Sequence, residues 1–358
     1  MSSIFPLGSG EVAPPPPRKG GRGTALLVVI LVLLAAGVGA VVIKSATHFF
    51  DGTPADFTGA GTGEVIAHVI PGATASDIGD ELQAKGVVRS AAAFRAAARK
   101  DSRSLSLQPG YYRLRAQMKA TLALALLLDP SSRLRSKVTI PEGASLQRTL
   151  ALIAANTSGV SLSSLKAAAA NPNALGLPTY AAGHVEGFLF PATYDIEPNT
   201  SAVEVLTLMT QRFAESASAN QLEAGAKALG LTPLQVITMA SIIERESAGP
   251  TDRGKVARVF LNRYHRGMSF GSEATVRYAL GYPDRELTQS DIRIDSPYNT
   301  YRFAGFPPGP IGNPGDLAIQ AALHPTEGTW LYFFTRSDGT TVFSHTSAEF
   351  DASQRGNG

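Results

Sequence analysis

The feature that most constrains this chain is an uncharged apolar segment near its start. Residues 24–43, TALLVVILVLLAAGVGAVVI, form a run of 20 residues without a charge, which is the length of one bilayer-spanning helix. Three basic residues lie between positions 18 and 22, and a cationic flank marks the cytoplasmic side of a span. The pattern predicts a single-pass anchor in the cytoplasmic membrane, with a cytoplasmic N-terminus and extracytoplasmic domains after it. A cleaved signal peptide ending near Gly39-Ala40 is the alternative, which the length of the apolar run and of the segment before it disfavours.

The parts on either side of this segment differ in composition and pattern. Residues 1–23 are rich in Pro and Gly and predict a disordered cytoplasmic tail. Residues 44–63 predict a linker. Residues 64–136 show a strand, two helices and a second strand, with Thr74 or Ser76 as the first helix cap. This βααβ pattern resembles a LysM-like module, a class that often binds polymers containing N-acetylglucosamine; a structural spacer without a ligand is the alternative.

Charge and cysteine content exclude several classes of function. Residues 64–140 hold 12 basic and 6 acidic residues, whereas residues 141–358 hold 16 and 20, so the first part is expected to face an anionic surface or polymer. No basic run interleaved with aromatic residues is present, which argues against a nucleic-acid partner. The chain has no cysteine, and its histidines form no metal-binding motif. No phosphate-binding or dinucleotide-binding fingerprint occurs, so we expect neither a metal nor a cofactor.

One stretch predicts a helix that carries two carboxylates. Residues 232–249, TPLQVITMASIIERESAG, begin with a capping pattern of Thr232, Pro233 and Gln235 and end at Gly249-Pro250. At helical spacing Glu244 and Glu246 lie on the borders of the apolar side. A carboxyl in that position is partly desolvated, which raises its pKa and suits a general acid. Ion pairs at the rim of a buried helix are the structural alternative.

The segments around this helix predict a mixed α+β domain over residues 137–352. The stretch between residues 157 and 184 predicts a polar loop, and residues 201–229 predict one long helix. GMSFG at 267–271 matches a serine-hydrolase pattern but follows a helix where that pattern needs a strand, so we interpret it as a chance match. Residues 296–315 form a Pro/Gly-rich loop too long for a simple connection, and Asp338-Gly339 predicts a hairpin turn. Carboxylic acids beside such a loop, outside the membrane, favour cleavage of a wall polysaccharide.

Five segments in order carry a family resemblance: EGFLFPATYDI, MASIIERES, RVFLNRYHRGM, YNTYRFAGFPPGPIGNPG and ALHP followed by LYFF. Together they resemble the endolytic murein transglycosylase family, also called YceG-like, over roughly residues 24–350. The resemblance implies a membrane-anchored lyase that cuts nascent glycan strands between N-acetylmuramic acid and N-acetylglucosamine and leaves 1,6-anhydro-muramic ends. It also implies a role in ending glycan polymerisation, with peptidoglycan synthases as further partners.

The resemblance further implies site residues. The family's catalytic glutamate is the first Glu of A-S-I-[IV]-E-x-E, which falls on Glu244. Where the family usually has S/T-D-P-T-V this chain has Ser272 to Val276, so Glu273 replaces the family's aspartate. The substrate-binding candidates are Glu186, Phe190, Tyr194, Glu246, Glu273, Thr275, Tyr298, Asn299, Thr300, Tyr301, Pro308, Gly309, Asn313 and His324.

Two alternatives to this assignment stay open. The protein could be a membrane-anchored glycan-binding or synthase-scaffolding protein without turnover. In the second alternative, Glu246 rather than Glu244 is the catalytic acid.

Overall fold

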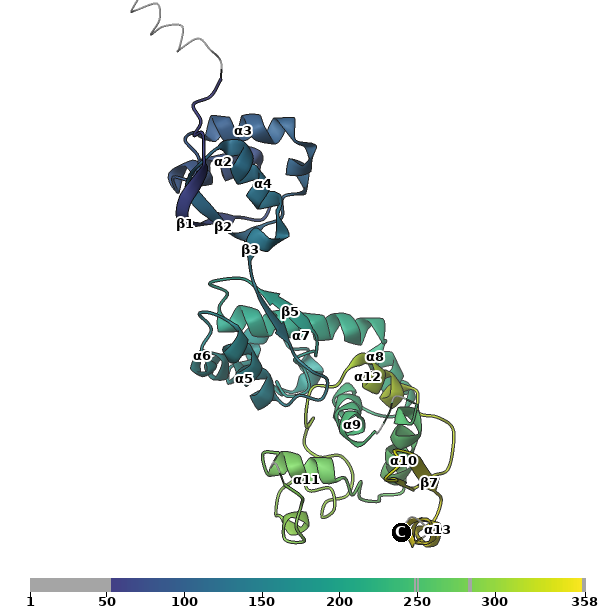
Figure 1. Cartoon of the computed structure of the whole chain (residues 1–358). Helices are drawn as coiled ribbons and strands as arrows, with labels where there is room; N and C mark the ends of the chain where they lie inside the picture. The colour runs from purple at the N-terminus through teal and green to yellow at the C-terminus, as the bar shows by residue number, and fades with distance from the viewer. Residues whose placement is uncertain (1–52, 248, 250, 283–284, 356–358) are drawn as a thin grey trace, which may run out of the picture. The chain divides into compact units, whose positions relative to one another are not determined.

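The structure is a computed structural model that describes residues 53–247, 249, 251–282 and 285–355. The expected membrane helix at residues 24–43, the expected tail and the first part of the expected linker lie outside the described residues. The described chain mixes helices with small sheets (Figure 1), as the α+β prediction requires. Its contacts divide it into two compact units.

Among the described residues, the first unit contains 53–63, 74–105 and 115–124. Its helices are α2, Ala75–Ala84, and α3, Ala91–Lys100, which pack on each other. Thr74 begins α2 with a capping box: its hydroxyl accepts from the Asp77 amide and the Asp77 carboxylate accepts from the Thr74 amide. Ile78, Leu82 and Phe94 are buried between the helices and their surroundings. Of the two caps expected from the sequence, Thr74 is the one observed.

The elements β1, α2, α3 and β2 follow one another in the predicted strand, helix, helix, strand order. Strand β1, Ala60–Val69, β2, Gly110–Met118, and β3, Arg133–Leu134, form a three-stranded sheet in the order β1-β2-β3. Strands β2 and β3 are antiparallel, with Tyr111 opposite Leu134. The LysM-like character of residues 64–136 and the boundary at 136 stay predictions.

The second unit contains residues 64–73, 106–114 and 125–358. Two further sheets lie in it, each a two-stranded antiparallel ribbon: β4, Ser136–Thr139, with β5, Thr193–Ile196, and β6, Tyr332–Thr335, with β7, Thr341–Ser344. Its helices are α5, Leu146–Asn156; α6, Leu162–Ala169; α7, Ala202–Ala219; α8, Leu222–Ala228; α9, Pro233–Glu246; α10, Arg253–His265; α11, Glu273–Ala279; α12, Asp316–Leu323; and α13, Ser347–Arg355. Helix α4, Ala120–Leu128, begins in the first unit and ends in the second.

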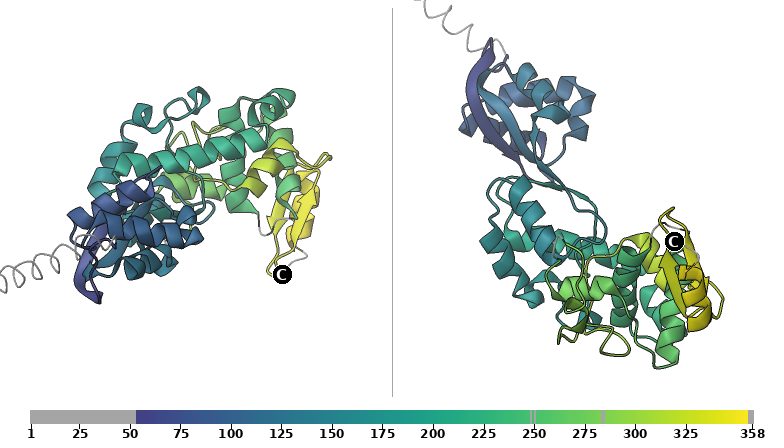
Figure 2. Two further views of the ribbon diagram at one scale, coloured as in Figure 1. Left: turned by 90° about the horizontal axis from the view of Figure 1, so that it is seen from above. Right: turned by 60° about the horizontal axis from the view of Figure 1, so that its bottom comes forward.

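Helix α9 is the centre of the larger hydrophobic core of the second unit. It contacts α8, α10, α11 and α12, which surround it in Figure 1. Ile237, Met239 and Ile243 of α9 pack there with Phe188, Phe260 and other apolar side chains. A separate core lies between β4, α5, α6 and α7. The β6–β7 ribbon, drawn in yellow in Figure 2, packs on α10 and α13. Its predicted turn at Asp338-Gly339 is confirmed.

Two local predictions differ from the structure. The expected long helix over residues 201–229 is two helices, α7 and α8, broken at Asn220 and Gln221. Gln221 has a φ of 50°, the left-handed conformation that ends a helix. Helix α6 forms within a stretch expected to be a polar loop, because Ser161 caps its first turn and Leu165 is buried. The segment before GMSFG is helix α10, so the required strand is absent there.

Within the described chain, no single helix is long and apolar enough to cross a bilayer. Helices α8 and α9 together have sufficient length and apolar composition, but they are bent by 93° at the break between them.

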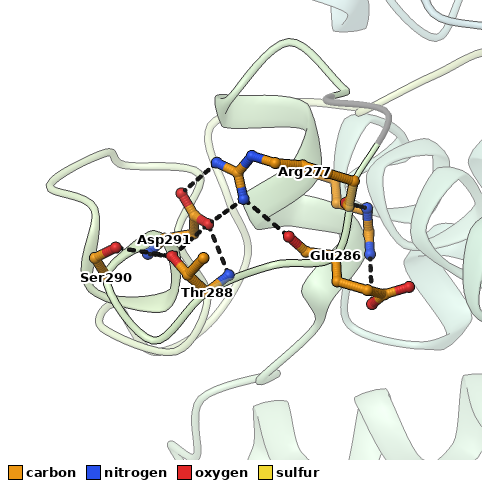
Figure 3. A network of polar contacts seen from close by, with 6 residues as sticks. Arg277, Glu286, Thr288, Ser290 and Asp291 are labelled. Atoms are coloured by element: carbon orange, nitrogen blue, oxygen red, sulfur yellow. Dashed lines mark hydrogen bonds and ion pairs between the residues drawn. The ribbon is translucent and has the colours of Figure 1, made fainter.

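The segment after α11 is held by a network of polar contacts (Figure 3). Arg285 binds both carboxylate oxygens of Asp291, at 2.6 and 3.0 Å, and the Thr288 hydroxyl and amide donate to the same carboxylate. Arg277 of α11 donates to the Arg285 carbonyl. These bonds, the Arg285 pair first, hold the pKa of Asp291 well below its usual range. The network fixes the chain that leads into the loop carrying Tyr298.

Candidate active site

Helix α9 begins where the sequence predicts. The Thr232 hydroxyl accepts from the Gln235 amide at 3.2 Å and the Gln235 side chain accepts from the Thr232 amide at 2.8 Å. Pro233 occupies the first turn. From Val236 to Ile243 every residue is buried, including the polar Thr238 and Ser241. Only the last turn, with Glu244, Arg245 and Glu246, reaches more open surroundings.

Glu244 lies at this end of the helix, among charged and backbone partners. Its side chain is 5% exposed, and its Oε1 accepts from the Arg253 guanidinium at 2.6 Å. Its Oε2 accepts from the Gly315 amide at 3.0 Å. Burial raises the pKa of this carboxyl; Gly315 and Arg253 act in the opposite direction without overcoming it. The group therefore holds a proton more tightly than a free glutamate and has two donors ready for its ionised form.

A second carboxylate, Glu142, also faces Arg253. Its Oε2 lies 3.9 Å from the Arg253 Nη2, and its side chain is 48% exposed. Its charge adds to the rise in the pKa of Glu244. Glu142 packs directly over Gly315, since a Cβ at Gly315 would lie within 3 Å of its carboxylate.

The turn at residues 141–145 lies beside Glu244 and is tied to the loop at 311–315. The Gly143 amide donates to the Asn313 carbonyl at 2.7 Å, and the Asn313 amide donates to the Ala144 carbonyl at 2.9 Å. Gly143 has a φ of 72°, and a Cβ there would lie 3.3 Å from the Glu244 Cγ. A side chain at this position would be strained and would crowd the carboxylate.

Glu246 has a different environment. Its Oε1 accepts from the Ser272 hydroxyl at 2.5 Å, with the Ala274 amide at 3.5 Å. Burial raises its pKa, and the Glu273 charge adds to the rise. These bonds tie the end of α9 to the start of α11, so Glu246 supports the position of that helix.

A pocket of about 530 Å³ lies on the same turn. It is lined by Pro141, Glu142, Gly143, Ala144, Ser145, Gln147, Arg148, Arg245, Gly281 and Tyr282. The Arg245 guanidinium lies 4.2 Å from the centre of the Tyr282 ring, a cation–π distance. The Tyr282 hydroxyl donates to the Ile311 carbonyl. Gly143 lines this polar and charged pocket and also lies against the Glu244 side chain.

Glu186 is buried near the first turn of α5. It accepts from the Leu146 amide at 2.8 Å, and it interacts with the Tyr278 hydroxyl. Burial raises its pKa from 4.5 to about 7. Tyr278 packs against Tyr298 and Tyr282, with ring centres 4.8 and 5.8 Å apart. The aromatic cluster shields the carboxyl from water.

A family model described as the YceG-like family matches residues 67–356. The chain belongs to the YceG-like family.

Relatives and a solved structure agree with the family assignment. An endolytic murein transglycosylase from Bacillus subtilis (strain 168) is 31% identical over 299 residues, which are 80% of this chain and 82% of the relative. One from Streptococcus pneumoniae (strain D39) is 29% identical over 80% of this chain, but the match spans 57% of that relative. A crystal structure described as YceG-like, from Listeria monocytogenes, matches with a TM-score of 0.56 and 27% identity, covering 81% of this chain and 98% of that one.

Several residues predicted to bind substrate in this YceG-like chain lie buried with their polar atoms already bonded. Asn313 is fully buried: its side chain accepts from the amides of Gly187 and Leu189 and donates to the Ala144 carbonyl and the Thr149 hydroxyl. Asn299 bonds the carbonyls of residues 292 and 294 and the amide of 301. Thr275 and Thr300 bond each other and the Ser272 backbone. We interpret all four as supports of the loops around the site.

The other predicted residues are spread over different places. Tyr301 and Pro308 are exposed on the loop, and Glu273 is exposed at the start of α11. Gly309 packs against the His184 ring. Phe190 is buried in the α9 core, and Tyr194 donates to its carbonyl at 2.6 Å. His324 is exposed and lines a separate pocket with Asn220 and Gln320. The role of each in binding stays a prediction.

The residues closest to Glu244 were not singled out from the sequence. Arg253, Glu142, Gly315 and Arg245 come from four different segments. Glu142 and Arg253 carried no distinctive spacing, although Arg245 was visible as the residue after Glu244. Within the described residues, no group of three His, Cys, Asp or Glu side chains is placed to hold a metal ion.

Proposed function

We propose that this chain is an endolytic murein transglycosylase with Glu244 as its single acid and base. The substrate would be a glycan strand of peptidoglycan, cut at the β-1,4 bond between N-acetylmuramic acid and N-acetylglucosamine. The supporting observation is the environment of Glu244: a carboxyl whose pKa is raised by burial, held by Arg253 and the Gly315 amide beside a polar pocket. The names of the relatives supply the substrate class.

The environment suits both halves of the proposed reaction. Protonated Glu244 gives its proton to the bridging oxygen as the bond from that oxygen to C1 of muramic acid breaks. The resulting carboxylate is stabilised by Arg253 and the Gly315 amide. The C6 hydroxyl of the same sugar then attacks C1 and returns its proton to Glu244. The product is a 1,6-anhydro end, and water is not consumed, so a second carboxylate is not required to activate it.

The test compares two isosteric variants on uncrosslinked glycan strands, with products identified by mass spectrometry. Glu244→Gln should lower the release of anhydro-ended fragments by about 10²-fold or more, while Glu246→Gln retains part of the activity because its contacts are structural. Undiminished release by Glu244→Gln protein would sink the assignment. Loss confined to Glu246→Gln would exchange the two roles. Binding of strands by the wild type without anhydro products would favour a non-catalytic scaffold.

The proposal includes a location. Residues 24–43 would anchor the chain in the cytoplasmic membrane with the described residues outside, close to where peptidoglycan synthases extrude new strands. An enzyme held there could cut strands during synthesis and so end their polymerisation. The apolar length of the segment and its basic flank support this placement.

A further inference from the structure

The proposed reaction leaves part of the pocket beside Glu244 without a role. Glu244 is bonded to Arg253 and the Gly315 amide, whereas Arg148 and Arg245 line the pocket next to Gly143 and bond neither of its carboxylate oxygens. Both arginines are exposed. Neither forms an ion pair with any described residue, although the charge of Arg245 acts to lower the pKa of the buried carboxyls of Glu186 and Glu244. Two such guanidinium groups in one pocket indicate an anionic ligand.

Backbone geometry adds to the positive charge. Ser145 and the first turn of α5 line the same pocket, and Ser145 is the N-cap of that helix. The N-terminal end of a helix carries partial positive charge. Glu142 also lines the pocket, but its carboxylate faces Arg253. The lining is therefore polarised, with its positive part formed by Arg148, Arg245 and the start of α5.

Arg245 is also held in place. Its guanidinium stacks on Tyr282, whose hydroxyl is bonded to the Ile311 carbonyl. An arginine fixed in this way loses less conformational freedom when it binds a carboxylate, and its planar group can form two parallel bonds to it.

The pocket volume of about 530 Å³ suits part of a short peptide and not a long sugar chain. In murein, each muramic acid carries a short peptide through its lactyl group, and that peptide bears free carboxylates. We propose that Arg148 and Arg245 bind a carboxylate of the peptide on the muramic acid next to the cleaved bond. This inference rests on the proposed function. It makes the chain selective for peptide-bearing strands over bare glycan.

The test uses three matched preparations of uncrosslinked strands: peptide-bearing with free carboxylates, peptide-bearing with the carboxylates converted to amides, and peptide-free. Arg148→Gln should raise KM about tenfold on the first preparation, as expected for loss of a charge-assisted bond. It should change KM little on the other two, with kcat unaffected. Arg212→Gln is the matched control, because Arg212 pairs with Glu215 on the exposed face of α7 and does not line the pocket.

Arg148→Gln decides the outcome, since Arg245 also packs near Gly143 and its loss can disturb Glu244. Equal wild-type kcat/KM on all three preparations, or equal losses in the variant, would overturn the inference and leave the proposed function standing. Absence of anhydro products from every preparation would instead refute the proposed function.

A binding measurement tests the pocket assignment separately from catalysis. Calorimetry with a disaccharide–pentapeptide and Glu244→Gln protein should show about tenfold weaker binding when Arg148→Gln is added. Equal affinity would refute the pocket assignment.

Discussion

Glu186, Glu244 and Glu246 each hold a carboxyl group away from water, and in each case burial raises the pKa. The three carboxyl groups differ in the groups that they bond. Glu246 bonds a serine hydroxyl and Glu186 a helix amide, so both link one segment to another. Glu244 alone of the three bonds an arginine. In the proposed reaction, that partner would stabilise the charged form of Glu244 after proton transfer.

The pH dependence of the reaction should report Glu244. Because the group acts first as an acid, kcat/KM should fall as pH rises through its raised pKa. Arg253 favours the ionised form, so Arg253→Gln should raise that pKa further and move the alkaline limb of the profile to higher pH. The measurement is kcat/KM against pH, with Arg212→Gln keeping the wild-type profile. A shift of the limb to lower pH would contradict the role given to Arg253.

Glu186 should make stability depend on pH. In the folded chain its pKa is about 7, against an ordinary value of 4.5, so the native state binds its proton more tightly than the unfolded chain. The free energy of unfolding contributed by this group is therefore complete below pH 4.5 and is lost as pH rises towards 7, by roughly 3 kcal/mol. Urea unfolding of wild type and Glu186→Gln between pH 4 and 8 measures the difference.

The glutamine in that variant still accepts from the Leu146 amide, so the chain should fold and lack only this part of the pH slope. Glu215→Gln, a neutralised exposed glutamate of α7, should keep the wild-type slope. Identical slopes in wild type and Glu186→Gln would show that Glu186 does not titrate in this range.

At the scale of single residues, the sequence sufficed to place Glu244 just beyond the buried part of its helix, because that position follows from helical periodicity within one segment. Its catalytic role, which a family motif implies, stays a prediction. It did not suffice for Arg253, Glu142 or Gly315. Glu142 and Gly315 meet Glu244 through chain folding over many positions, and no local pattern records that contact.

At the scale of elements, the start of α9 was predictable because its capping residues are local signals, whereas the helix ends at Glu246, before the expected stop at Gly249-Pro250. The break between α7 and α8 was not, since Gln221 adopts a left-handed conformation that glycine or asparagine would have signalled. The loop at residues 296–315 was recognised as unusual from its length and composition. Asn299 and Asn313 of this loop are predicted to bind substrate, but their side-chain amides are buried. Burial within a loop leaves no periodic pattern in the sequence, so it could not be predicted.

The clearest element-scale prediction concerns Asn313, which joins three segments. Its side chain bonds the amides of Gly187 and Leu189 and the Ala144 carbonyl, and all these groups are buried. Asn313→Ala leaves them without partners and should lower the free energy of unfolding by about 2–4 kcal/mol. Because the same loop positions the Gly315 amide, kcat should fall as well. Urea unfolding and turnover on glycan strands provide the two measurements.

Asn171→Ala is the matched control, because Asn171 is exposed and its side chain makes no capping bond. Its effect should stay within about 0.5 kcal/mol. A change of similar size in both variants would show that Asn313 does not hold the loop.

At the scale of the whole molecule, the proposed anchor gives a prediction about the mature protein. An uncleaved membrane helix leaves residues 24–43 joined to the domains that follow them. The protein should therefore sediment with membranes and resist extraction by salt or high pH, because burial of a 20-residue apolar helix does not depend on charge. Intact mass spectrometry of the membrane fraction checks this. A mature chain beginning just after Ala40 would favour the signal peptide.

The contact between Glu244 and the Gly315 amide also has a consequence for the order of events during biosynthesis. The chain is made from its N-terminus, so the acid is synthesised 71 residues before the amide that orients it. Asn313, which ties that loop to the turn at 143–144, is equally late. A partly synthesised chain therefore carries its acid without the surroundings that tune it. Under the proposed function, activity would begin only when nearly the whole domain has been synthesised and folded.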